Sequence, residues 1–140
     1  MAPLQEHTDE LDGQPVFWRS APADAATGAA PVLYLHGVPT SSDDWPPFLE
    51  RTGGLAPDLP GFGRSGKRGD LQFTMAGLAH FVDRFLEHTQ TERVRLVVHD
   101  WGVIGLLWAM RHPERVARPA VLGAAPIPPG LPPPRGAGAW

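Results

Sequence analysis

The sequence predicts an α/β domain in which helices flank a mostly parallel β-sheet. Two nearly continuous apolar runs, at 31–36 and 94–98, are typical of strands buried on both faces, as in a parallel sheet. Apolar residues recur at helical spacing over 74–88, and the segment 103–110 is apolar on all sides, so both are expected to be helices. Because strands and helices alternate along the chain, we expect the strands to form a parallel sheet.

Five segments have the composition of strands, and we expect them at 15–19, 31–36, 54–59, 94–98 and 116–122. Pro57 and Pro119 interrupt the third and the last of these, because proline has no N–H to donate to a sheet. An alanine-rich stretch at 20–30 follows the first strand and is expected to be a loop.

The two predicted helices have recognisable ends. Thr74 is expected to cap the first helix, which continues to about His88. The apolar residues of this helix form one stripe, made of Met75, Leu78, Ala79, Val82, Phe85 and Leu86. The second helix, 103–110, is expected to pack deep against the sheet and to end before Pro113.

Length and composition restrict the organisation of the chain. Its 140 residues allow one domain at most, and 42% hydrophobic residues are enough to build a buried core. Glycine and proline are frequent, and they occupy 11 of the 22 positions from 119 to 140. We expect a flexible N-terminal segment at 1–14, a core domain at 15–123 and a disordered Pro/Gly-rich tail at 124–140.

Composition also excludes several classes of function. The chain has no cysteine, which rules out disulfides, thiolate metal sites and a cysteine nucleophile. A net charge of −3 argues against nucleic acid or an anionic membrane as partner. The N-terminus lacks the features of a secretory signal and no run of 18 apolar residues occurs, so we expect a cytoplasmic protein. No set of His, Asp and Glu residues has the spacing of zinc ligands.

The segment Val98-His99-Asp100-Trp101-Gly102 connects a predicted buried strand to a predicted buried helix. Asp100 would lie at the carboxyl end of the sheet, where α/β proteins bind ligands, and at a helix N-terminus, where N–H groups favour negative charge. These residues leave two interpretations open. Asp100 is either a catalytic carboxylate or a residue that only caps the helix.

Two further segments follow predicted strands. In His36-Gly37-Val38-Pro39, Gly37 allows a sharp turn that would direct the N–H of Val38 toward Asp100. The other segment is a glycine-rich loop, Asp58-Leu-Pro-Gly-Phe-Gly-Arg-Ser-Gly66.

The glycine-rich loop contains the spacing of a dinucleotide-binding fingerprint, at Gly61, Gly63 and Gly66. That fingerprint requires a helix that begins at the loop and an acidic residue at the end of the next strand. The residues that follow Gly66 are a poor start for a helix, and the nearest acids at that range lie within the helix predicted at 74–88. The nucleotide interpretation is therefore rejected.

Three motifs in this order resemble the α/β-hydrolase fold family: a strand ending in His-Gly-x-Pro, the loop Asp-x-x-Gly-x-Gly-x-Ser, and the turn x-His-Asp-Trp-Gly. The Asp at the turn is similar to that of the branch with haloalkane dehalogenases and epoxide hydrolases. The resemblance covers about residues 15–118. It implies the α/β-hydrolase fold, with this chain truncated after about the sixth strand.

The resemblance implies roles for three residues. Asp100 would be a nucleophile that attacks a saturated carbon and becomes an alkyl ester. The N–H groups of Val38 and Trp101 would form the oxyanion hole for hydrolysis of that ester. The substrate would be a small epoxide or alkyl halide, and no metal or organic cofactor would be needed. His36 is expected to shape the loop that carries Val38, and His99 to point away from Asp100.

The sequence leaves the choice between epoxide and halide open. The indole N–H of Trp101 would either bind a departing halide or belong to an aromatic ring that only packs. Val38 stands where many dehalogenases have an Asn that donates to the halide, which weakens the dehalogenase interpretation. Val98 stands where many epoxide hydrolases have Gly, which favours the dehalogenase interpretation. Tyr34 lies in a predicted buried strand and is expected in the core, whereas epoxide hydrolases use cap-domain tyrosines.

The catalytic His and the acid that the resemblance implies have no counterpart in this sequence. In the family they follow later strands, whereas this chain has no His after His112 and no Asp or Glu after Glu114. Three interpretations stay open: an Asp-nucleophile hydrolase, a catalytically incomplete fragment or frameshifted remnant, and a half-enzyme completed by a separate partner. The oligomeric state is not predicted.

Overall fold

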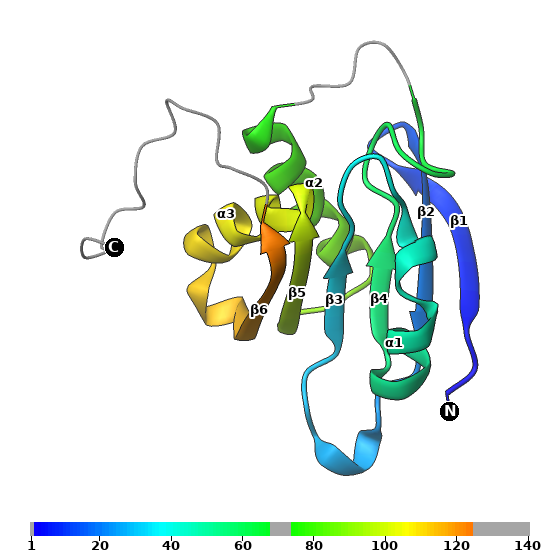
Figure 1. The fold of residues 1–140 in the computed structure, drawn as a ribbon, viewed down its shortest axis with the longest axis vertical. Coiled ribbons are helices and arrows are strands. Elements are labelled where there is room, and N and C mark those ends of the chain that lie inside the picture. Colours follow the sequence, from blue (N-terminus) through cyan, green and yellow to red (C-terminus); the bar gives the residue numbers. More distant parts are fainter. Residues whose placement is uncertain (1, 68–73, 125–140) are drawn as a thin grey trace.

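One six-stranded sheet carries helices on both faces (Figure 1). The computed structural model describes residues 2–67 and 74–124. The strand order is β1-β2-β4-β3-β5-β6. Strand β3 runs parallel to β4 and β5, and β6 runs parallel to β5, whereas β1 pairs antiparallel with β2 and β2 antiparallel with β4. The predicted α/β architecture with a mostly parallel sheet is confirmed.

The strands and helices have the following bounds. The strands are β1 Gln5–Leu11, β2 Gln14–Ala21, β3 Val32–Leu35, β4 Gly54–Pro57, β5 Val94–Asp100 and β6 Val116–Ala124. The helices are α1 Pro46–Thr52, α2 Met75–His88 and α3 Ile104–Arg111. Short 3-10 turns lie at Ala25–Thr27, Ser42–Asp44, Trp101–Val103 and Pro113–Arg115.

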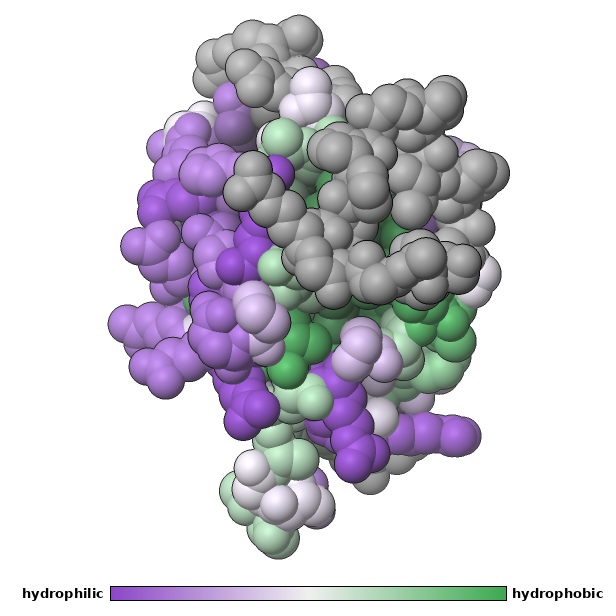
Figure 2. Space-filling view, turned by 90° about the vertical axis from the view of Figure 1, so that its left-hand side faces the viewer, coloured by the Kyte–Doolittle hydropathy of each residue, from purple (hydrophilic) through white to green (hydrophobic). Residues whose placement is uncertain are grey.

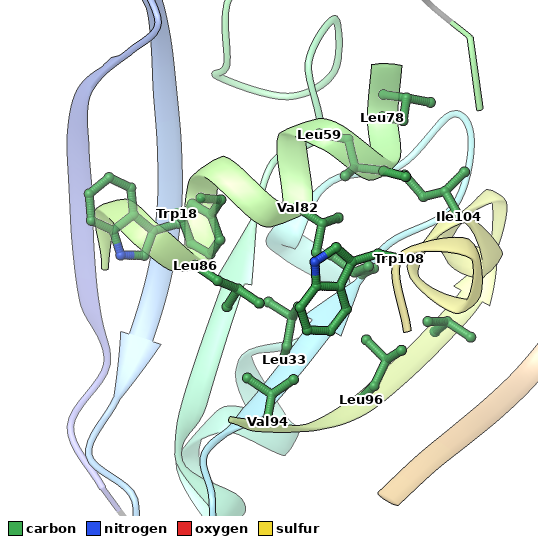
Figure 3. Packing of buried hydrophobic residues seen from close by; sticks show 14 of the residues in the cluster. Trp18, Leu33, Leu59, Leu78, Val82, Leu86, Val94, Leu96, Ile104 and Trp108 are labelled. Carbon is green, nitrogen blue, oxygen red and sulfur yellow. The ribbon is translucent and has the colours of Figure 1, made fainter. Parts of the chain in front are cut away.

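Alternate residues of β3 point to opposite faces of the sheet, as the pleat of a strand requires. Leu33 and Leu35 belong to the larger hydrophobic core, which packs beneath α2 and α3 (Figure 3). Val32 and Tyr34 belong to a smaller core on the face that α1 covers. Since β3 is buried on both faces, the position of its carboxyl end is fixed by packing from two sides.

Helix α2 confirms the helix predicted from the apolar stripe. The Thr74 side chain accepts a hydrogen bond of 3.0 Å from the N–H of Gly77, so Thr74 caps the helix as expected. The buried residues of α2 are Leu78, Ala79, Val82, Phe85 and Leu86, all members of the predicted stripe. Helix α3 buries Ile104, Gly105 and Trp108 against the same core.

The expectation that 1–14 is a flexible segment is wrong for the seven residues of β1. A two-residue turn, Asp12–Gly13, connects β1 to β2, and its φ angles are 52° and 78°. Both are left-handed, as in the hairpin turns that Asp-Gly favours. Because β1 is an edge strand with mostly exposed side chains, no apolar alternation marks it in the sequence. The Asp-Gly pair is the local signal for this hairpin.

Other boundaries differ by a few residues. Strand β2 continues to Ala21 and a 3-10 turn follows at Ala25–Thr27, so the loop expected at 20–30 is shorter. Helix α1 has no counterpart among the predicted elements. Its N-cap residue is Trp45, which is not a capping residue type and makes no capping hydrogen bond through its side chain, so the sequence has no start signal for this helix. Of the tail predicted at 124–140, Ala124 ends β6 and the rest lies outside the described residues.

Apolar side chains are exposed on the side of the molecule formed by α3 and β6 (Figure 2). Val121 and Leu122 of β6 are 47% and 45% exposed, and Met110 of α3 is 45% exposed. The part of the chain that the structure describes contains no helix long and apolar enough to cross a bilayer.

Candidate active site

Strand β5 ends at Asp100, directly before the turn Trp101–Val103 and helix α3. The backbone of Asp100 has φ 50° and ψ −118°, a conformation that residues with a side chain rarely adopt. Strain of this kind is found where a sharp strand-to-helix turn presents a residue at a functional site. The Asp100 side chain makes no capping hydrogen bond, so the interpretation of Asp100 as a helix cap is wrong.

Two glycines after Asp100 allow α3 to lie close to β3. A Cβ atom at Gly102 would overlap the carbonyl oxygen of Leu35, and one at Gly105 would lie 2.6 Å from Cδ1 of Leu35. The clash at Gly102 is with backbone, so only glycine fits there, whereas the atoms around Gly105 are the ends of side chains. The close packing brings the turn at Asp100 beside the end of β3.

The backbone N–H of Val38 donates a hydrogen bond of 2.9 Å to Oδ2 of Asp100. A third glycine makes this contact possible, because a Cβ atom at Gly37 would lie 2.6 Å from Cβ of Asp100 and 2.8 Å from Oδ2. The sharp turn predicted at Gly37 thus places the Val38 N–H beside Asp100, as expected.

Main-chain donors lower the pKa of the Asp100 carboxyl below its ordinary value. The N–H of Val38 has the largest effect and the N–H of Trp101 the next largest, while burial opposes them less strongly. Hydrogen bonds that favour the charged form have this direction of effect. Asp100 is therefore a carboxylate at neutral pH.

The structure brings the three predicted site residues together. Val38 and Trp101, whose N–H groups act on the Asp100 carboxylate, have large apolar side chains that are 40% and 39% exposed. This arrangement places a carboxylate beside two main-chain donors. The catalytic roles of the three residues stay predictions.

Two histidines lie next to the site in the sequence. His36 is fully buried, its Nδ1 lies 2.7 Å from the carbonyl oxygen of Gly37, and its Nε2 accepts a 2.8 Å hydrogen bond from the N–H of Leu59. Burial lowers the pKa of His36, so the ring is neutral, with its proton on Nδ1. His36 thus shapes the loop that carries Val38, as predicted. His99 is exposed on β5.

Sequence reasoning missed the buried carboxylate of Asp58. Asp58 begins the glycine-rich loop and is 0% exposed. Its two carboxylate oxygens accept hydrogen bonds from the backbone N–H groups of Ser42 and Arg64. The loop surrounds this carboxylate and α2 begins only at Met75, an arrangement unlike that of a dinucleotide site. The first residue of the Asp-x-x-Gly-x-Gly-x-Ser motif was the available signal.

No group of three or more metal-ligating side chains is present among residues 2–67 and 74–124. A largely apolar pocket of about 200 Å³ lies away from Asp100, between the turn at Asp12, the glycine-rich loop and α2. The candidate site is therefore the strand-to-helix turn at Asp100 and not this pocket.

Comparison with known proteins establishes the family. The family model described as the alpha/beta hydrolase fold matches residues 30–140. The chain belongs to the α/β-hydrolase fold family, in agreement with its sheet and with its strand-to-helix turn.

Two haloalkane dehalogenases are among the proteins that this chain is similar to. A haloalkane dehalogenase of Sphingobium indicum is 41% identical over 119 residues, which are 79% of this chain and 40% of the relative. The crystal structure of the haloalkane dehalogenase DatA from Agrobacterium tumefaciens C58 is similar with a TM-score of 0.75 and 30% identity, over 86% of this chain and 41% of that chain. The chain thus spans less than half the length of these relatives.

The fold is also similar to that of a protein with a different named activity. The crystal structure of a membrane phospholipase A has a TM-score of 0.79 and 28% identity, over 92% of this chain and 42% of that chain. Fold alone therefore does not determine the reaction, which has to be argued from the site.

Proposed function

We propose that this chain carries the nucleophile of an α/β hydrolase that attacks alkyl halides through Asp100 and forms a covalent alkyl ester. The observation that carries this proposal is the hydrogen bond from the Val38 N–H to Oδ2 of Asp100. It fixes one carboxylate oxygen on a main-chain donor, and we assign the other, Oδ1, as the attacking atom. The lowered pKa of Asp100 keeps the nucleophile ionised.

The first step is a displacement at a saturated carbon. An electron pair of Oδ1 forms the new C–O bond, the carbon–halogen bond breaks, and its electron pair leaves with the halide. In the resulting ester, Oδ2 is the carbonyl oxygen. The N–H groups of Val38 and Trp101 would stabilise the negative charge that develops on Oδ2 when water adds to the ester.

Two features favour a halide over an epoxide. The indole N–H of Trp101 can only donate, so it can stabilise a departing halide without acting as a base. Tyr34, the single tyrosine of the chain, is 3% exposed and hydrogen-bonds to Thr52, so it is not placed to protonate an epoxide oxygen. The dehalogenases among the similar proteins agree with this preference.

Hydrolysis of the ester requires a base near Asp100. His36 does not fit this role, because both ring nitrogens are engaged in the core. The resemblance assigns the base to a His after the last strand of the fold, and this chain spans 40% of the Sphingobium relative. We therefore propose that the 140-residue chain alone stops at the ester. The complete reaction would require the part of the fold beyond β6.

The test is to incubate the purified chain with 1-bromobutane or with 1,2-epoxybutane and to measure its intact mass and the bromide released. The proposal predicts one butyl adduct on the peptide that contains Asp100, with an equal amount of bromide. Asp100→Asn is expected to form no adduct. Asp44→Asn, which neutralises an exposed aspartate instead, is expected to react like the unmodified chain.

The possible results separate the interpretations. Absence of any adduct in the folded chain would contradict an Asp100 nucleophile and favour the inactive remnant. An adduct with the epoxide alone would overturn the halide assignment. Continuous release of butanol would contradict the proposal that the chain stops at the ester.

A further inference from the structure

The glycine-rich loop has no part in the reaction described so far, yet it holds a fully buried carboxylate. Oδ1 of Asp58 accepts a 2.7 Å hydrogen bond from the N–H of Ser42, and Oδ2 accepts a 2.8 Å hydrogen bond from the N–H of Arg64. The donors come from two different loops, one after β3 and one after β4. Asp58 therefore connects these loops through main-chain groups.

The glycine-rich loop closes tightly around this carboxylate. Gly63 has φ 54°, and a Cβ atom there would overlap Oδ2 of Asp58. The Ser65 hydroxyl donates a 2.7 Å hydrogen bond to the carbonyl oxygen of Asp58 and accepts one of 3.1 Å from the N–H of Phe17. Gly63 and Ser65 of the motif thus hold Asp58 in one position.

The loop that carries Val38 is attached to the same segment at both of its ends. At its start, His36 contacts the Gly37 carbonyl oxygen and accepts from the N–H of Leu59. At its far end, the N–H of Ser42 binds Asp58. Between these two attachments lies the Val38 N–H that contacts Asp100.

We propose that Asp58 is a positioning residue that holds the loop from Gly37 to Ser42 so that the Val38 N–H stays on Oδ2 of Asp100. A donor at an oxyanion position stabilises charge only when it is held at hydrogen-bond distance from that oxygen. Asp58 acts on Val38 through Ser42 and does not itself touch the nucleophile. Its value for catalysis rests on the proposed function, whereas its effect on Val38 and Asp100 can be measured without any substrate.

The test is Asp58→Asn in the full chain. Asn has nearly the shape of Asp, but its NH₂ group cannot accept a hydrogen bond, so one of the two loops loses its acceptor. We expect hydrogen exchange of the Val38 amide to accelerate by about tenfold or more, as the loss of a hydrogen bond to a charged group would produce. In an NMR titration, we expect the pKa of the Asp100 carboxyl to rise toward its ordinary value.

Two controls separate positioning from general loss of stability. Asp44→Asn removes an exposed charge two residues after Ser42 and is expected to leave both readouts unchanged. Val82→Ala removes buried volume from α2 and lowers stability without removing a hydrogen bond of either loop. If Val82→Ala shifts Val38 exchange and the Asp100 pKa as much as Asp58→Asn does, the proposal is wrong.

A milder variant covers the case in which Asp58→Asn does not fold. Ser65→Ala removes the hydroxyl that donates to the Asp58 carbonyl oxygen and should move both readouts in the same direction by a smaller amount. Unchanged readouts in a folded Asp58→Asn chain, or in Ser65→Ala where Asp58→Asn is unfolded, would overturn the inference. If the readouts shift and the unmodified chain forms no adduct with 1-bromobutane, the proposed function fails and the positioning role stands.

Discussion

The Val38 N–H lies 2.9 Å from Oδ2 of Asp100, although 62 positions separate the two residues in the chain. The contact joins the ends of β3 and β5, which are parallel neighbours with Leu35 opposite Val98. Parallel strands end at the same edge of a sheet, so a turn after each strand can bring their residues together. The first prediction concerns the glycine that permits this contact.

Gly37→Ala is expected to slow alkylation of Asp100 by about tenfold or more, because a bound donor and nucleophile would both have to move. The new Cβ atom would lie 2.6 Å from Cβ of Asp100. Overpacking of this kind lowers the free energy of unfolding by about 1–3 kcal/mol. Intact-mass kinetics and urea unfolding measure the two effects. Gly77→Ala, in the first turn of α2, serves as control and should retain the unmodified rate.

The pH dependence of alkylation is expected to follow the lowered pKa of Asp100. The rate should be constant near neutral pH and reach half its maximum below the ordinary aspartate pKa of about 4. The same shift affects stability, since the folded chain binds this proton less readily than the unfolded chain. The stabilisation is present above the unfolded pKa and is lost as pH falls through the folded one. A half-maximal rate at or above pH 4 would contradict this prediction.

Thr74→Ala is expected to destabilise the chain by about 1 kcal/mol, because it removes the oxygen that accepts from the N–H of Gly77. Thr74→Ser keeps an oxygen at the same position and should leave the free energy of unfolding close to that of the unmodified chain. Urea unfolding monitored by circular dichroism gives both values. Equal losses for the two variants would show that the cap contributes little.

The hairpin that joins β1 to β2 depends on the left-handed conformation of Gly13. With φ at 78°, Gly13→Ala is expected to lower the free energy of unfolding by about 1–2 kcal/mol. Gly13→Asn should lower it less, because Asn tolerates this conformation better than Ala. Thermal unfolding of the three proteins tests the order, and an Ala variant as stable as the unmodified chain would argue against the hairpin.

The sequence by itself determined the elements in which the spacing of apolar residues indicates which side chains are buried. The stripe from Leu78 to Leu86 predicted α2, and the buried run at 94–98 predicted most of β5. The strand-to-helix turn at Asp100 was predicted because a strand, a turn residue and a helix follow one another directly. The turn expected at Gly37 directed the Val38 N–H toward Asp100, and the resemblance to a known family assigned it the role of an oxyanion donor.

The tertiary structure alone decided which distant residues meet. Strand β1 has too few apolar residues to be predicted, and it is held by pairing with β2. The motif marks Asp58, but its burial depends on main-chain donors of Ser42 and Arg64, which the fold brings to it. A local sequence pattern indicates whether a residue faces the core, whereas contacts between residues distant in the chain follow from the order of the strands in the sheet. That order determined that β3 and β5 are neighbours, and so that Val38 reaches Asp100.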